Sequence, residues 1–211
     1  MNTKCIIMSG LSGAGKTTII EAIAKQRPDI EKVITSTTRP IRPGEKNGVH
    51  YYFYCLKDFE KMIQNDEFFE TTTVYSGKEN SLEEAKHYGS EKVEVNRILN
   101  SGHIPVFVCD IKGAETLSEK LETSVSIFLM PDSIENLKSR LKNREGSTPN
   151  DIKLRLQNIE EEIERSKMCD YIVINREGQL EDAVKEVLNI IDRETNENKE
   201  SSIEISENKL K

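Results

Sequence analysis

The chain has 211 residues, of which 36% are hydrophobic and 6% aromatic; that is enough for one substantial core but cramped for two independent domains. Its net charge of −7 argues against broad electrostatic capture of nucleic acid or of an anionic membrane, so any phosphate chemistry must use local basic clusters. No apolar run approaches the roughly 18 residues that span a bilayer, and the amino terminus carries no cleavage signal, which predicts a cytoplasmic protein.

Strands and helices alternate at both ends of the chain. An apolar strand at residues 4–9 leads through a glycine-rich loop into a helix over 16–25. The later elements expected, in chain order, are a strand at 104–109, a helix at 114–121, a strand at 125–129, helices at 134–141 and 152–163, a strand at 171–174 and a helix at 180–191. Such alternation predicts a parallel sheet covered by helices on both faces.

Residues 34–102 break this alternation. The segments expected there, in chain order, are turns at 42–44 and 47–48, an aromatic strand-type run at 51–54, a helix at 56–65 and a helix at 91–100 with Ser90 as its N-cap. We therefore expect an inserted lobe of mixed α and β structure. The polar run at 194–211 predicts a mobile tail.

Cysteines and histidines do not form a site in this sequence. The four cysteines contain no CxxC pair, so buried reduced thiols are expected rather than a zinc site or a disulfide framework. The three histidines are equally scattered and suggest no metal ligation. The acidic run Glu160-Glu161-Glu162 is expected on the solvated face of a helix.

A phosphate-binding loop is the strongest motif. Residues 10–17 read GLSGAGKT and match G-x-x-x-x-G-K-[ST] between a strand and a helix. Backbone N–H groups of such a loop wrap a β-phosphate, Lys16 places a cation against the β and γ oxygens, and the Thr17 hydroxyl can bind Mg²⁺. The residues expected to hold ATP are Gly10, Ser12, Gly13, Ala14, Gly15, Lys16, Thr17 and Thr18. No N-K-x-D motif of the GTPases follows.

An acceptor for the transferred phosphate is indicated by the run TSTTRPIRPGE at 35–45. Arg39 and Arg42 stand three apart beside a cluster of hydroxyls, with Tyr51 downstream. Two guanidinium groups and a phenol suit the dianion of a phosphate monoester.

With this run the chain resembles the guanylate kinase family. The further motifs that carry the resemblance are NGVHYYF at 47–53, FFE at 68–70, YGS at 88–90, the strand end at 110–113, three later arginines and IVIN at 172–175. The resemblance runs in order from about residue 4 to 192. It implies the three-layer α/β/α fold of P-loop NTPases with a parallel central sheet, an inserted acceptor-binding lobe and a small helical lid.

One domain over residues 1–193 is the organisation that follows. Its core would take residues 1–33, 103–136 and 156–193, with the acceptor-binding lobe at 34–102 and the lid at 137–155.

The resemblance also implies an activity and the residues for it. The reaction is phosphoryl transfer from Mg-ATP to GMP or dGMP. The implied roles are Arg39, Arg42, Tyr51 and Tyr88 for the acceptor phosphate; Thr35, Glu70, Ser90 and Asp110 for the base; Arg140, Arg144 and Arg155, with Lys16, for the transferring group; and Asn175 for the adenine side. Carboxylates accept from the N1–H and N2–H₂ groups of guanine, and adenine has no N2 group to offer.

Two departures from the family's pattern stand out. The connection at 71–87 is longer than usual, and Val108 and Lys112 replace an acid and a glutamine. Two other functions therefore stay open: a P-loop kinase for another phosphorylated acceptor, such as a different nucleotide or a ribose bisphosphate, and a catalytically silent module that binds phosphopeptides. Small nucleotides, rather than nucleic acid or membrane, are the expected partners, and a monomer and a homodimer are equally compatible with the sequence.

Overall fold

A computed structural model describes residues 4–74, 85–137 and 158–207, and the side chains among these as far as Thr195. Its central sheet has five parallel strands in the order β2-β7-β1-β8-β9. These strands are β1 (Cys5–Gly10), β2 (Ile30–Lys32), β7 (Ile104–Val108), β8 (Ser124–Pro131) and β9 (Tyr171–Asn175). The parallel sheet expected from the alternating pattern is confirmed.

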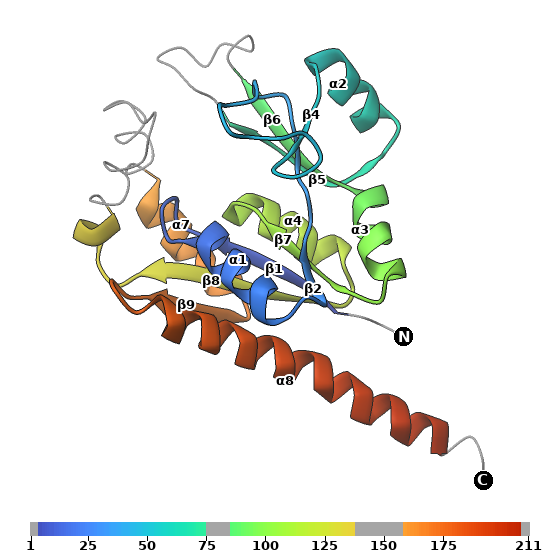
Figure 1. Cartoon of the computed structure of the whole chain (residues 1–211), viewed down its shortest axis with the longest axis vertical. Helices are drawn as coiled ribbons and strands as arrows, with labels where there is room; N and C mark the ends of the chain where they lie inside the picture. The colour runs from blue at the N-terminus through green and yellow to red at the C-terminus, as the bar shows by residue number, and fades with distance from the viewer. Residues whose placement is uncertain (1–3, 75–84, 138–157, 208–211) are drawn as a thin grey trace.

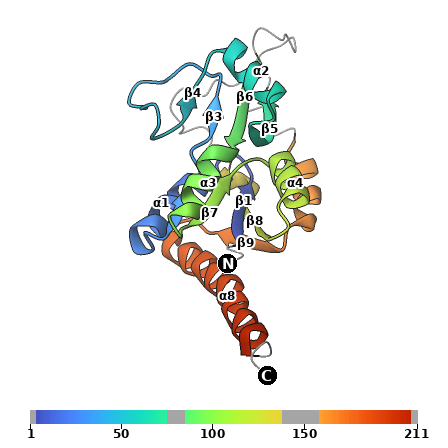
Figure 2. The same ribbon diagram turned by 90° about the vertical axis from the view of Figure 1, so that its right-hand side faces the viewer.

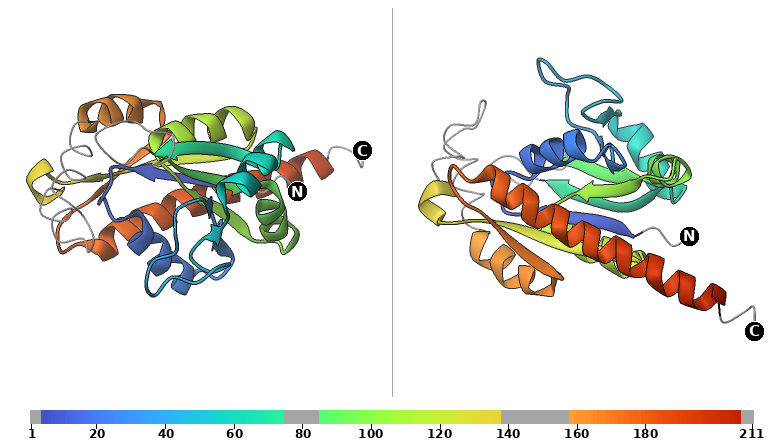
Figure 3. Two further views of the ribbon diagram at one scale, coloured as in Figure 1. Left: turned by 90° about the horizontal axis from the view of Figure 1, so that it is seen from above. Right: turned by 60° about the horizontal axis from the view of Figure 1, so that its bottom comes forward.

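Helices cover both faces of this sheet, so the core has three layers (Figure 3). Side chains alternate along β1: Ile6 and Met8 pack in the cluster that includes α1 (Lys16–Gln26) and α8 (Leu180–Glu207). Ile7 points the other way, into the cluster that includes α3 (Lys92–Asn100) and α4 (Ile111–Lys120). The helix α7 (Ile159–Arg165) lies beside α4.

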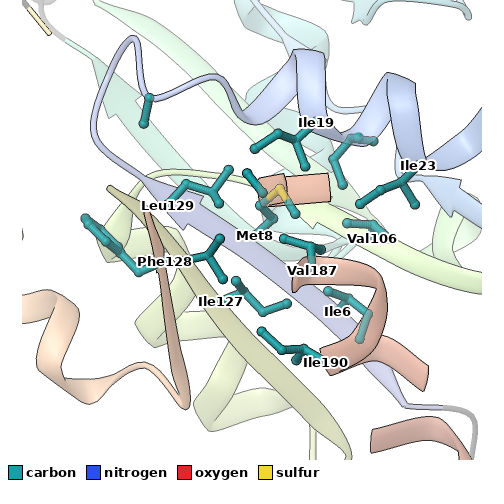
Figure 4. Close-up of a cluster of buried hydrophobic side chains, with 14 of the residues drawn as sticks. Ile6, Met8, Ile19, Ile23, Val106, Ile127, Phe128, Leu129, Val187 and Ile190 are labelled. Atoms are coloured by element: carbon teal, nitrogen blue, oxygen red, sulfur yellow. The ribbon is translucent and has the colours of Figure 1, made fainter. Parts of the chain in front are cut away.

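The larger cluster consists mostly of branched aliphatic side chains and draws on every strand of the core sheet. Figure 4 shows Ile19 of α1 beside Met8, and Val187 and Ile190 of α8 beside Ile6 and Ile127. Burial of each such side chain is worth about 1.5–3 kcal/mol. This packing fixes the start of α1, and with it the glycine loop, against the sheet.

The inserted lobe carries its own sheet, with strand order β4-β3-β6-β5. Its elements are β3 (Ser36–Thr37), β4 (Tyr52–Phe53), α2 (Leu56–Gln64), β5 (Phe68–Val74) and β6 (Lys86–Glu91). The pairs β3–β6 and β5–β6 are antiparallel and β3–β4 is parallel. The lobe stands at one end of the core sheet (Figures 1 and 2), and its mixed α and β content agrees with the expectation.

Some local expectations were wrong. Ser90 is not an N-cap, because it belongs to β6 and pairs with Glu70; the cap of α3 is Glu91. Cys55 is exposed rather than buried. The helix α8 continues to Glu207, past the expected boundary at residue 193. Residues 194–207 contain no glycine or proline to stop a helix, and Glu194 is held by Lys4 at 2.6 Å.

Other expectations lie partly outside the described residues. The helix expected at 134–141 is described to residue 137, where Ser133 Oγ accepts from the Asn136 N–H at 3.1 Å as an N-cap does. Almost all of the lid at 137–155 is outside. None of the helices in the described part of the chain offers a run long and apolar enough to cross a membrane.

Candidate active site

The glycine loop between β1 and α1 takes backbone conformations that favour glycine. Gly10, Gly13 and Gly15 have φ of 144°, 89° and 96°. A Cβ on Gly10 would lie 2.3 Å from the carbonyl oxygen of Leu129, and one on Gly15 would lie 2.5 Å from Nδ2 of Asn175. Glycine is therefore required at both positions, because the loop packs directly on the ends of β8 and β9.

Two hydrogen bonds fasten the loop to these strands. The N–H of Leu11 donates to the Leu129 carbonyl at 3.3 Å, and the buried Asn175 amide donates to the Ala14 carbonyl at 2.8 Å. Asn175 was expected on the adenine side of the site. The structure places it beneath the loop, where its position determines that of the loop backbone.

Lys16 opens α1 and curls back over the loop. Its ammonium donates to the carbonyl oxygens of Gly10 and Leu11. Thr17 and Thr18 follow on the first turn with exposed side chains, whereas Ser12 and Gly13 are partly exposed. The positive end of the α1 macrodipole and the Lys16 charge thus meet at one place, as an anion site requires.

In the inserted lobe, Arg39 is buried with only 6% of its surface exposed. Its guanidinium is held by both carboxylate oxygens of Glu45, at 2.7 and 3.0 Å. This pairing lowers the pKa of the Glu45 carboxyl. The Arg39 guanidinium also lies over the ring of Tyr51, 5.2 Å from its centroid. A bidentate clamp and a ring contact fix the guanidinium without occupying all of its donors.

Tyr51 and Tyr88 meet edge to face, with ring centroids 6.2 Å apart. Three of the four residues expected to hold the acceptor phosphate, Arg39, Tyr51 and Tyr88, are therefore brought together. The fourth, Arg42, has an exposed side chain, and its N–H donates to Glu45 at 2.8 Å. The clamp residue Glu45 thus orders the backbone at Arg42 as well.

Glu70 and Ser90 face each other across β5 and β6. The Ser90 hydroxyl donates to one Glu70 oxygen at 2.8 Å. The other Glu70 oxygen is buried and has no hydrogen-bond partner among the described residues. Burial, with a smaller contribution from nearby Asp110, raises the pKa of Glu70 to about 7. A buried acid with one unpaired oxygen is prepared to accept a hydrogen bond from a ligand.

Asp110 lies on the core side of this region, at the start of α4. One of its oxygens caps α4 by accepting from the Gly113 N–H at 2.8 Å, and the other accepts from Thr72 of β5 at 3.2 Å. The second bond joins core to inserted lobe. The neighbouring Cys109 thiol has a pKa raised well above its usual range by burial and by the charges of Glu70 and Asp110. Thr35, the remaining residue expected to face the base, is half-buried where the chain enters the lobe.

Two residues near the site were not recognised from the sequence. From the sequence, no role was assigned to Glu45, which belongs to the RPGE run. Its position three residues after Arg42 could have indicated a carboxylate close to the arginines. Glu162 was expected in solvent but is half-buried. Burial raises the pKa of its carboxyl, the charge of Lys16 lowers it, and the charge of Asp110 raises it. Its neighbours Glu160 and Glu161 are exposed, as expected. Arg140, Arg144 and Arg155 lie outside the described residues.

Comparison with known proteins identifies the family. The family model described as guanylate kinase matches residues 2–194. A guanylate kinase of Carboxydothermus hydrogenoformans is 38% identical over 182 residues, 86% of this chain and 84% of that protein. The chloroplastic/mitochondrial guanylate kinase 2 of rice is 37% identical over 190 residues, 90% of this chain but 64% of that longer protein.

A solved structure agrees with these sequence relatives. The crystal structure of guanylate kinase from Anaplasma phagocytophilum superimposes with a TM-score of 0.70 at 26% identity, covering 91% of this chain and 86% of that one. Because the family model spans nearly all of the described core and inserted lobe, the likeness includes both halves of the site. The chain belongs to the guanylate kinase family, the P-loop nucleoside monophosphate kinases that transfer a phosphoryl group from ATP to GMP.

Proposed function

We propose that this protein phosphorylates GMP or dGMP with Mg-ATP, and that the unpaired carboxylate oxygen of Glu70 recognises the guanine. This oxygen is the observation that carries the proposal. Ionised Glu70 accepts from the N1–H and N2–H₂ edge of guanine, with Ser90, Thr35 and Asp110 around it. An adenine in the same place would leave the carboxylate buried without a donor, which costs about 1–3 kcal/mol or more.

The donor site in this proposal is the glycine loop. Backbone N–H groups between Gly10 and Thr18 wrap the ATP phosphates at the positive end of α1. Lys16 exchanges its contacts with the Gly10 and Leu11 carbonyls for the β and γ oxygens. Asn175 acts through the loop, by holding the Ala14 carbonyl.

The acceptor phosphate in this proposal lies against Arg39, Arg42, Tyr51 and Tyr88. Arg39 is held in place by Glu45 before substrate arrives, so little side-chain entropy is lost when it binds. Arg42 is exposed on the adjoining loop and comes to the phosphate when the loop closes. By family resemblance, Arg140, Arg144 and Arg155 approach the transferring group from the lid.

A magnesium ion fits this site. Mg²⁺ prefers hard oxygen ligands, and typically takes one or two from protein while the rest come from phosphates and water. The Thr17 hydroxyl is exposed on the first turn of α1, next to Lys16, and supplies such an oxygen. When bound, Mg²⁺ would supply positive charge that offsets the negative charge developing on the transferred phosphoryl group.

No general base is needed for the reaction. The second pKa of a phosphate monoester is about 6, so the attacking oxygen is largely ionised at neutral pH. The residues must align two polyanions and offset the charge between them, which Lys16 and the arginines do best once water is excluded. We place this reaction in the cytoplasm, on free nucleotides: a net charge of −7 disfavours association with polyanions.

An acceptor panel tests the function. ATP consumption is measured with Mg²⁺ and GMP, dGMP, AMP, CMP, UMP or a ribose bisphosphate. GMP or dGMP should exceed every other acceptor by about 100-fold or more in kcat/KM. Equal or better turnover of any other acceptor would overturn the guanine assignment.

The variant Lys16→Ala tests the role of the glycine loop in this reaction. Its phosphoryl transfer should fall by at least about 100-fold because charge stabilisation at the donor phosphates is lost. GMP binding, measured by calorimetry, should persist. Unchanged turnover would reject the role of the glycine loop.

A further inference from the structure

Lys32 is the last residue of β2, where the chain leaves the core sheet for the inserted lobe. It lies opposite Val106 of β7, so its backbone belongs to the core. Its ammonium, however, stands 5.7 Å from the ring centroid of Tyr51 in the inserted lobe. The contact therefore joins the two lobes at a residue proposed to hold the acceptor phosphate.

Lys32 is a partly buried cation that has an acid nearby but forms no ion pair among the described residues. The side chain is half-buried, and burial lowers the pKa of its ammonium. No carboxylate comes within ion-pair distance of it among the described residues; Glu21 of α1 is the nearby acid that favours its charge. A half-buried cation without a close counter-ion gains more from an arriving anion than a solvated one does.

Cationic side chains from both lobes contact the Tyr51 ring. Arg39 of the inserted lobe lies 5.2 Å from the ring centroid and Lys32 of the core 5.7 Å. Arg39 is itself fixed by Glu45, and Lys32 provides a contact between the ring and the core. An aromatic face attracts each cation, and the attraction grows where water is excluded.

We infer that Lys32 is a positioning residue for the acceptor phosphate: it fixes the Tyr51 ring from the core lobe and adds positive charge beside the proposed phosphate site. This inference rests on the proposed function, since it concerns the same acceptor. Neither the phosphate loop nor the TTRPIRPGE run contains Lys32, so no motif of the sequence assigns it a role. The alternative is a purely structural role, in which the aliphatic part of the Lys32 side chain covers apolar atoms.

Lys32→Met tests the inference because methionine keeps the unbranched stem and removes the charge. We expect KM for GMP to rise roughly three- to tenfold. KM for ATP and the melting temperature should change little. Lys32→Arg should restore KM for GMP to near the wild-type value, since it restores the cation. Lys25→Met, which removes a charge from exposed surface on α1 of the same lobe, is the matched control and should leave both KM values unchanged.

Coupling to Tyr51 separates positioning from a structural role. In a Tyr51→Leu background, Lys32→Met should raise KM for GMP by a smaller factor than in the wild-type protein, because the part of its effect that acts through the ring is gone. Lys32→Gln gives a second neutral variant if the methionine variant folds poorly, with the same expectation.

Several outcomes would overturn the inference. One is an unchanged KM for GMP in folded Lys32→Met and Lys32→Gln; another is an equal effect of Lys25→Met; a third is an undiminished effect in the Tyr51→Leu background. Absence of GMP turnover in the wild-type protein would instead refute the proposed function. The wild-type assay therefore distinguishes the two failures.

Discussion

At the scale of single residues, the recognition of guanine that we propose for Glu70 comes with a cost in folding stability. It is 3% exposed, and its pKa is about 7 in the folded protein against an ordinary 4.5. The folded state therefore holds a proton that the unfolded chain releases. Stability from this proton is fully present below pH 4.5 and is lost as the pH rises through 7.

Glu70→Gln should remove this dependence. At pH 8 the free energy of unfolding of the variant should be about 3 kcal/mol higher than that of wild type, since the pKa rises from 4.5 to about 7 and one pKa unit corresponds to about 1.4 kcal/mol. At pH 4.5 the two proteins should be nearly equal. Urea unfolding at both pH values measures this.

The same variant should lose acceptor selectivity, because glutamine presents an N–H₂ group toward the guanine donors. Glu60→Gln, an exposed change on α2, is the control and should leave stability unchanged at both pH values. A Glu70→Gln variant less stable than wild type at pH 8 would contradict the raised pKa.

Sequence reasoning identified residue types at the site better than their partners. The arginines, tyrosines and Glu70 were predicted from motifs. Residues that lie close together in the sequence can be recognised as a motif without knowledge of the three-dimensional structure. The partners Glu45 and Thr72 could not be assigned in this way. Thr72 meets Asp110 from 38 residues away, and only the relative placement of β5 and β7 brings them together.

At the scale of elements, the end of β9 supports the glycine loop. Asn175 donates to Ala14 and would collide with any Cβ at Gly15. A strand end and a loop 161 residues apart in sequence are thus fitted to each other.

Asn175→Ala should loosen the loop. The Ala14 carbonyl loses a buried donor, which should cost about 1–3 kcal/mol of folding stability. KM for ATP should rise while KM for GMP changes little, because the proposed acceptor site lies in the other lobe. Steady-state kinetics with each nucleotide varied, together with thermal melting, measures both effects.

Asn65→Ala, at the exposed end of α2, is the control for this change. Equal effects of Asn175→Ala on both KM values would argue that the asparagine supports the whole fold rather than the loop.

Elements with a clear hydrophobic pattern were predictable from the sequence, whereas short or irregular elements were not. The strands β1, β7, β8 and β9 were found because each is a continuous apolar run. The strand β2 contains only Ile30–Lys32 and is too short to show a hydrophobic pattern. The antiparallel pair β5–β6 was missed because its strands contain threonine, glycine and charged residues and because β5 ends at Val74 whereas β6 begins only at Lys86.

At the scale of the whole molecule, Glu94 ties the lobes together near the crossing point of the chain. It lies on α3, is 3% exposed, and accepts from the Ile34 N–H and the Tyr52 hydroxyl at 3.4 and 3.3 Å. Ile34 is in the connection from core to inserted lobe, and Tyr52 begins β4. The carboxylate therefore sets how the inserted lobe leaves the core.

Glu94→Ala should leave these donors without their acceptor, which should cost about 1–3 kcal/mol. Hydrogen exchange should accelerate in β3 and β4 more than in the core strands, because the loss is local to the connection. Glu94→Gln retains an acceptor oxygen and should show a smaller effect. Uniform acceleration across both lobes would contradict a role specific to the connection.

The central place of β1 has a consequence for how the protein is made. The first strand to be synthesised lies between β7 and β8, and the loop after it rests on Leu129 and Asn175. A ribosome that has released only the early part of the chain has therefore produced the glycine motif without the surface that shapes it. Prematurely terminated polypeptides should be unable to sequester ATP, so nucleotide capture begins only when translation is nearly complete.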